Sequence, residues 1–97
     1  MSTAFRRWLE RKKYAVRTIQ SRSAEAARIE SYYGNLDTHY DRDRLESILH
    51  ELEYSKDDQA RNRKNPTRIQ IDGDIYSNLN TYRSTARLYR KYRDDRS

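Results

Sequence analysis

The chain has no cysteine, one proline and two glycines among its 97 residues. The missing cysteines exclude disulfides, cysteine-ligated zinc sites and thiol catalysis, and they fit a reducing compartment. No apolar run is long enough for a membrane span or a signal-peptide core, so we expect a soluble, cytoplasmic protein. A glycine-rich phosphate loop, a nucleophile elbow and a metal dyad are also missing, so we expect neither an independent enzyme nor a cofactor.

Two patterns that resemble metal motifs are too sparse to bind metal. Asp72-Gly73-Asp74 has too few ligands for a calcium loop, and it is typical of a turn followed by a helix cap. His39 and His50 are separated by acidic sequence and lack further ligands at metal spacing. We therefore expect no catalytic and no metal-binding residues.

Tyrosine and charge are the abundant features. Nine tyrosines accompany one tryptophan and one phenylalanine, and 34% hydrophobic residues give a single domain with a lean core. Tyrosine suits a thin core because its ring packs while its hydroxyl reaches water. Most tyrosines lie at helical core spacing. Tyr32, Tyr40 and Tyr54 are the candidates for exposed rings that stack on bases.

Charge of the two signs is segregated along the chain, which carries +6 in total. Residues 1–34 hold eight Lys/Arg against three Asp/Glu, residues 35–60 hold three against eight, and residues 61–97 hold ten against four. If both basic ends share one face, that face suits a polyanion and the acidic segment points away from it. A patchy surface that serves only solubility is the alternative.

The apolar periodicity predicts an all-α domain. We expect helices over residues 4–13, 16–33, 42–53, 57–63 and 74–93, with Ser2-Thr3 capping the first and connectors over 35–40 and 67–72. The expected core positions are Phe5, Trp8, Leu9, Val16, Ile19, Ser23, Ala26, Ile29, Tyr33, Leu36, Leu45, Ile48, Leu49, Leu52, Ile69, Ile71, Ile75, Leu79, Tyr82, Ala86 and Tyr89. Gly34 is expected to end the second helix, and Asp41 or Asp43 to begin the third.

Segments at both ends of the chain resemble a known family. The opening has Phe5-Arg6-Arg7-Trp8-Leu9 and Tyr14-Ala15-Val16-Arg17-Thr18-Ile19, and the close has Gly73-Asp74-Ile75-Tyr76-Ser77-Asn78-Leu79, Tyr82-Arg83-Ser84-Thr85-Ala86 and Tyr89. These motifs resemble the N-terminal core-binding module of tyrosine recombinases of the phage integrase type. They are also similar to the helical domain ahead of restriction-type nucleases and GTP-driven methylcytosine restriction subunits.

The resemblance covers nearly the whole chain. It implies a SAM-like orthogonal bundle of four to five helices that holds the DNA backbone while another domain does the chemistry. The chain departs from the pattern in its acidic middle and in its long connector over residues 55–72.

Three groups of side chains are candidate DNA contacts. The outer face of the last helix carries Arg83, Arg87, Arg90 and Lys91. The loop before Pro66 carries Arg61, Arg63 and Lys64. The start of the second helix carries Arg17, Thr18, Gln20 and Arg22, where free backbone N–H groups favour phosphate and where Gln20 and Arg22 are candidates for contacts with base edges. The alternatives are a solvated helix face, a surface linker and ordinary capping.

Together these features predict a non-catalytic module that binds duplex DNA mainly through phosphates. Its setting would be a recombination, restriction or other mobile-element or defence system, with a catalytic domain or another protein as a further partner. The alternative is a small phage-type interaction or inhibitor protein that acts on a nucleic-acid-processing complex. In that case either the acidic stretch from Asp37 to Asp58 would dock, with a DNA mimic as one form of this role, or the basic face would meet an acidic partner.

Overall fold

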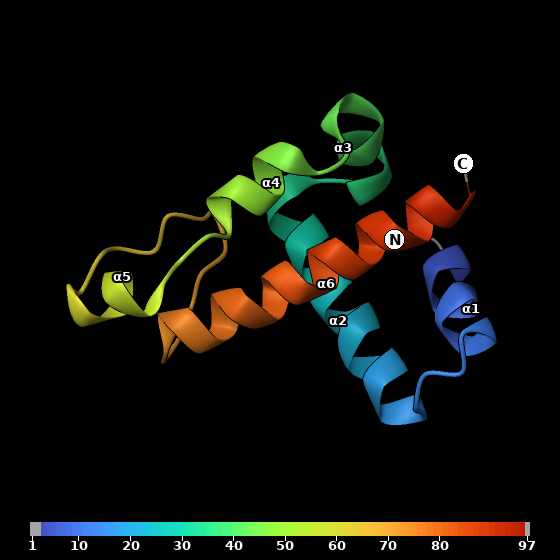
Figure 1. Ribbon diagram of the computed structural model, residues 1–97, viewed down its shortest axis with the longest axis horizontal. Coiled ribbons are helices and arrows are strands. Elements are labelled where there is room, and N and C mark those ends of the chain that lie inside the picture. The colour runs from blue at the N-terminus through green and yellow to red at the C-terminus, as the bar shows by residue number, and fades with distance from the viewer. Residues whose placement is uncertain (1–2, 97) are drawn as a thin grey trace.

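The computed structural model describes residues 3–96, and this part of the chain is all-helical with no strand. Its helices are α1 (Thr3–Arg11), α2 (Val16–Tyr33), α3 (Leu36–Asp43), α4 (Glu46–Glu51), α5 (Lys56–Ala60) and α6 (Ile75–Arg96) (Figure 1). The predicted all-α class is confirmed, with six helices where four to five were expected. The predicted capping by Ser2 lies outside the described residues. None of the helices between Thr3 and Arg96 is long and apolar enough to cross a bilayer.

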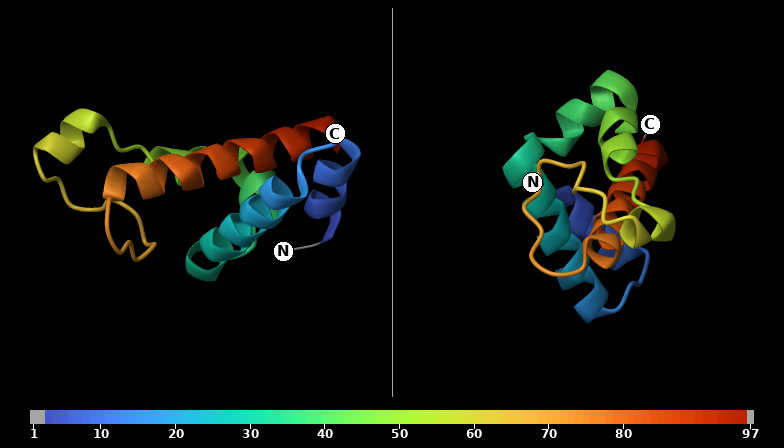
Figure 2. Two further views of the ribbon diagram at one scale, coloured as in Figure 1. Left: turned by 90° about the horizontal axis from the view of Figure 1, so that it is seen from below. Right: turned by 90° about the vertical axis from the view of Figure 1, so that its left-hand side faces the viewer.

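The two long helices, α2 and α6, cross at the centre of the molecule, and α1, α3 and α4 pack around the crossing (Figure 1). Helix α1 packs on both of them near the C-terminal end of α6, while α4 packs along α6 and α3 joins α4 to α2. Figure 2 shows α5 beyond the start of α6, at the opposite end of the molecule from α1. The α2–α6 crossing therefore sets which side chains of these two helices share a surface.

An aromatic cluster fastens α1 to the C-terminal half of α6. The ring centroid of Phe5 lies 4.8 Å from that of Tyr89 and 5.4 Å from that of Tyr92, and Trp8 lies 5.8 Å from Tyr92. The Trp8 indole Nε1 also donates to Asp95, 3.2 Å away. These contacts extend the ordered helix past the predicted end at residue 93, because the last turn of α6 has partners on α1.

Most of the predicted core is buried, and Val16 is the clear exception. Phe5, Leu9, Ala26 and Ile29, together with Leu79, Ala86 and Tyr89 of α6, are inaccessible to solvent, whereas Val16 is 70% exposed. The prediction for Val16 is wrong because α2 begins to pack only at Ile19, one turn further on. Tyr54 is the opposite error: it is buried, and its hydroxyl donates to the Arg63 carbonyl at 2.5 Å.

The predicted connector over 35–40 is helical from Leu36 onward, and the predicted helix over 42–53 is divided between α3, which ends at Asp43, and α4, which spans Glu46–Glu51. Arg44 and Leu45 both adopt left-handed backbone angles, with φ of 55° and 67°. These two residues interrupt the helix and so separate α3 from α4. The Asn35 side chain caps α3 by accepting the Asp37 N–H. Asp43 ends α3 rather than beginning a helix, yet its carboxylate accepts the N–H and the hydroxyl of Ser47 at the start of α4.

The sequence signals at the end of α2 and the start of α5 are matched by the structure, whereas the end of α5 differs. Gly34, with φ of 86°, ends α2 as predicted, and its N–H donates to the Glu30 carbonyl. Ser55 and Asp58 form a capping box at the start of α5. That helix stops at Ala60, short of the predicted residue 63, and Asn62 then takes a left-handed conformation with φ of 54°.

Candidate nucleic-acid interface

An exposed ridge runs along the outer side of α6. It consists of Asn80, Ser84, Arg87 and Lys91, which we call the α6 ridge. Spacings of four, three and four residues place these side chains on one face of the helix. A groove lies on each flank of the ridge, one toward α2 and one toward α4.

The groove toward α2 is rich in hydroxyl and amide groups. This α2–α6 groove is lined by Arg17, Thr18, Ser21, Arg22, Glu25, Asn80, Thr81 and Ser84. Arg22 is held beside the groove because its Nη1 donates to Glu25 at 3.1 Å and to the Thr85 hydroxyl at 3.0 Å. The Thr85 hydroxyl in turn donates to the same Glu25 oxygen at 2.5 Å. These bonds tie Arg22 to Glu25 on α2 and to Thr85 on α6, so its guanidinium already has protein partners at the edge of the groove.

The N-terminus of α2 borders this groove and has no side-chain cap. The N-cap residue, Ala15, makes no side-chain cap, and the first turn holds no acidic residue. The first N–H groups and the positive end of the helix dipole therefore remain available to an anion. Arg17 and Gln20 are exposed here, and Thr18 is half-buried against the groove.

The groove on the other flank of the ridge has mixed charge. This α4–α6 groove is lined by Glu46, Leu49, His50, Glu53, Arg83, Arg87 and Arg90. Arg90 lies 3.9 Å from the Glu46 carboxylate, and Arg83 donates to the Asn80 side-chain oxygen at 3.0 Å. The acidic residues of α4 thus lie against the basic face of α6, whereas the sequence led us to expect them to point away.

The cations of the loop after α5 form a separate group. Arg61 pairs with Asp57 at 3.2 Å and Arg63 pairs with Asp58 at 3.3 Å, while Lys64 is exposed. Because these residues directly follow α5, they lie at the far end of the molecule from α1 (Figures 1 and 2). The structure therefore does not bring this group onto the α2–α6 groove.

The cations predicted to contact DNA fall into two groups: those that already pair with a carboxylate of the protein and those that do not. Arg22, Arg61, Arg63 and Arg90 each lie within 4.0 Å of a carboxylate. Within residues 3–96, the predicted cations that form neither an ion pair nor a side-chain hydrogen bond are Arg17, Lys64, Arg87 and Lys91. Three of these, Arg17, Arg87 and Lys91, belong to the α6 ridge or the adjacent start of α2. Arg17 lines the α2–α6 groove, Arg87 lines the α4–α6 groove, and Lys91 lies at the C-terminal end of the ridge.

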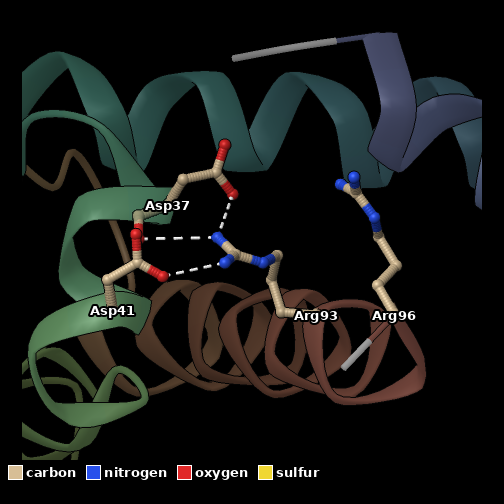
Figure 3. Close-up of a pocket in the computed structure, with 4 residues that line it drawn as sticks. All are labelled: Asp37, Asp41, Arg93 and Arg96. Carbon is tan, nitrogen blue, oxygen red and sulfur yellow. Dashed lines mark hydrogen bonds and ion pairs between the residues drawn. The ribbon is translucent and has the colours of Figure 1, made fainter.

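A strong polar cluster that sequence reasoning missed joins the end of α6 to α3 (Figure 3). Arg93 donates from one nitrogen to Asp37 and from the other to Asp41, each at 2.8 Å, and its guanidinium lies 4.5 Å from the centre of the Tyr40 ring. We call Asp37, Asp41 and Arg93 the α3–α6 clasp. In Figure 3, Arg96 extends beside Arg93 and is not linked to either carboxylate; it donates to the Tyr92 hydroxyl at 2.6 Å.

Neighbouring groups reinforce the clasp and shift its acid–base properties. Tyr89 donates to Asp37 at 2.8 Å, and burial raises the pKa of the Tyr89 hydroxyl. Asp94 receives the Arg44 guanidinium at 2.6 Å, and this hydrogen bond, with one from Tyr40, lowers the pKa of Asp94. The carboxylates of Asp37 and Asp41 offset the charge of Arg93, so the clasp itself offers no net positive charge to a polyanion. No sequence signal links these residues, because helix periodicity relates only near neighbours.

Nothing in residues 3–96 groups three or more His, Cys, Asp or Glu side chains as a metal ligand set would require. His50 approaches Glu53 at 3.9 Å, while the His39 Nε2 donates to the Tyr33 carbonyl and its Nδ1 accepts from the Arg42 guanidinium. No protein-family model, curated protein or solved structure matches the chain. The function is therefore inferred from the surfaces described above.

Proposed function

We propose that this chain is a non-catalytic helical module that binds duplex DNA through the α6 ridge and the start of α2. In this proposal the bundle has the SAM-like core-binding arrangement and serves a recombination, restriction or other mobile-element or defence system. The observation that carries the proposal is the run of the α6 ridge, with its exposed Arg87 and Lys91, into the α2–α6 groove, which Asn80 and Ser84 of the ridge line together with Arg17. Arg17, Arg87 and Lys91 form no ion pair within residues 3–96, and the groove beside Arg17 presents hydroxyl and amide donors.

The dimensions of the ridge suit a duplex backbone. Asn80 and Lys91 are separated by three turns, which is about 16 Å along the helix axis. That distance corresponds to the rise of about five base pairs. Arg87 and Lys91 would hold successive phosphates, Ser84 and Asn80 would donate hydrogen bonds, and Arg17 would reach the backbone from α2. Phosphate contacts of this kind give affinity that is steeply dependent on salt.

The aromatic side chains favour a duplex over a single strand. Binding of single strands relies on exposed rings on which bases stack. Of the three tyrosines predicted to be exposed, Tyr54 is buried, and Tyr32 and Tyr40 are half-buried beneath the guanidinium groups of Arg28 and Arg93. A row of such platforms is absent from the surface formed by residues 3–96, whereas the row of cations is present.

The acidic segment gives less support to a docking or DNA-mimic role. Asp37 and Asp41 bind Arg93, Asp43 binds Ser47, and Glu51 accepts the Tyr33 hydroxyl at 2.9 Å. Most of these carboxylates therefore stabilise the fold itself. A DNA mimic would instead need its carboxylates directed at a partner.

Fluorescence anisotropy with a labelled duplex of about 20 base pairs, at about 50 and about 200 mM salt, tests the proposal. We expect the wild-type chain to bind the duplex more tightly than its single strand, and the double reversal Arg87→Glu/Lys91→Glu to abolish binding. The matched control is Arg42→Glu/Lys56→Glu, which makes the same change in net charge at exposed positions on α3 and α5. Circular dichroism of both variants checks that helicity is retained. Equal losses in the two variants, or no duplex binding by the wild type, would overturn the proposal.

A further inference from the structure

The turn between α1 and α2 presents two large apolar side chains to solvent. Tyr14 is 36% exposed and Val16 is 70% exposed, while the other apolar residues of α1 and α2 at core spacing are buried. Val16 is the first residue of α2, and Tyr14 precedes it by two positions. We call this pair the apolar tip.

Positive charge flanks the apolar tip in the sequence. Lys13 and Arg17 flank it, and both are exposed. Neither forms an ion pair with any carboxylate in the described part of the chain, and the first turn of α2 contains no acid. An apolar patch edged by uncompensated cations complements a polyanion that also offers apolar surface. In DNA, the phosphates meet the first requirement, while the sugars, base faces and thymine methyl groups meet the second.

The tip is continuous with the proposed interface. Arg17 lies next to Val16 in α2 and also lines the α2–α6 groove. Gln20 is exposed one turn after Val16, on the same side of the helix. If Arg17 binds a phosphate of the DNA backbone, the base edges in the adjacent DNA groove would therefore lie beside Val16 and Gln20.

We propose that Tyr14 and Val16 enter a groove of duplex DNA and make the apolar contacts that accompany phosphate binding by Arg17. This inference rests on the proposed function and adds the group that touches bases and sugars. Val16 packs against a thymine methyl or a sugar, and the Tyr14 ring covers the neighbouring sugar or base edge. Gln20 supplies an amide to the same base edges.

The salt dependence of binding separates the apolar contact from the ionic one. An apolar contact releases no counterions, so its loss weakens binding equally at every salt concentration. We expect Val16→Ala to weaken duplex binding about fivefold without changing the slope of log K against log salt. Arg17→Gln should instead reduce that slope by about 0.9. Tyr14→Ala, made separately, should behave like Val16→Ala.

Alanine at Val16 keeps the helix intact because the side chain is largely exposed and alanine is a strong helix former. Thermal melting confirms folding, and Tyr14→Phe, which keeps the ring, should bind as the wild type does. If the wild type binds duplex and Val16→Ala binds equally well, the apolar contact is refuted while the proposed function stands. A changed salt slope in Val16→Ala would also refute it. Failure of the wild type to bind duplex would refute both, and a protein partner would then be the occupant to seek.

Discussion

Arg93 on α6 and Asp37 on α3 meet at 2.8 Å although 56 residues separate them in the chain. Only 20% of the Arg93 side chain and 34% of the Asp37 side chain remain exposed. Tyr89 adds a second hydrogen bond to the same Asp37 oxygen. The pair closes the C-terminal half of α6 against α3, so its effect on the fold is measurable apart from any effect on DNA binding.

Asp37→Asn should lower the free energy of unfolding by about 1–2 kcal/mol. The substitution removes the charge that faces the largely buried Arg93 and weakens the bond from Tyr89. Asp41→Asn is the matched control, since Asp41 binds the same guanidinium at 2.8 Å but is 69% exposed. It should cost about 0.5 kcal/mol or less. Urea denaturation near neutral pH measures both, and equal costs would contradict a role for burial.

Acid should destabilise the fold below about pH 4. Arg44 lowers the pKa of Asp94, and hydrogen bonds from Ser47 and Ser55 lower the pKa of Asp43 and Asp58. Their stabilisation is fully present above the unfolded pKa, and it is lost as the pH falls through the lower folded pKa. Urea midpoints measured across this range should fall more gently in Asp94→Asn. The same acid slope in that variant as in the wild type would exclude Asp94 as a contributor.

Alkali should destabilise the fold through Tyr89. Burial, together with the hydrogen bond to Asp37, raises the pKa of its hydroxyl above the ordinary value of 10.0. The stabilisation is therefore complete below that value and is lost as the pH rises, because the unfolded chain ionises first. We expect Tyr89→Phe to be less stable near neutral pH and to lose stability more gently above pH 10. Tyrosinate absorbance should show that Tyr89 ionises only on unfolding, and early ionisation of all tyrosines would disprove this.

Glu46→Gln should strengthen duplex binding about two- to fivefold. Glu46 faces Arg90 at 3.9 Å and places negative charge in the α4–α6 groove, beside the ridge. Asp72→Asn makes the same charge change in the exposed connector and should have a smaller effect. Anisotropy at low salt compares the two. Equal gains would mean that only net charge matters, and no gain would place the groove outside the interface.

The sequence predicted the elements whose apolar residues recur with helical period. The bounds of α2 were correct, because Ile19, Ala26 and Ile29 mark its buried face and Gly34 ends it. Helix α3 was missed because Leu36 is its only buried residue, so no period is visible. The helix break at Arg44 and Leu45 could not be predicted from the sequence, since neither residue type favours a left-handed conformation.

The sequence predicted which cations share a face of one helix, but it did not predict which of them pair with carboxylates from other helices. The basic side of α6 follows from spacing within one helix, and the pair of Arg61 with Asp57 follows from a four-residue separation. The pairs that decide which cations are free come from different elements, as with Arg90 and Glu46. Such pairs depend on how the helices pack, and helix periodicity carries no information about that packing. Val16 shows the same limit, because its exposure depends on where the α1–α2 turn ends.

The left-handed conformations of Arg44 and Leu45 affect which part of the protein unfolds locally first. They leave α3 and α4 with eight and six residues, and α5 has five. Helices this short are unstable in water by themselves, so each forms only against α2 or α6. Backbone amides between residues 36 and 60 should exchange with deuterium well before those at the α2–α6 crossing. The acidic middle would then detach as one unit and uncover the basic face of α6 while the two long helices stay packed.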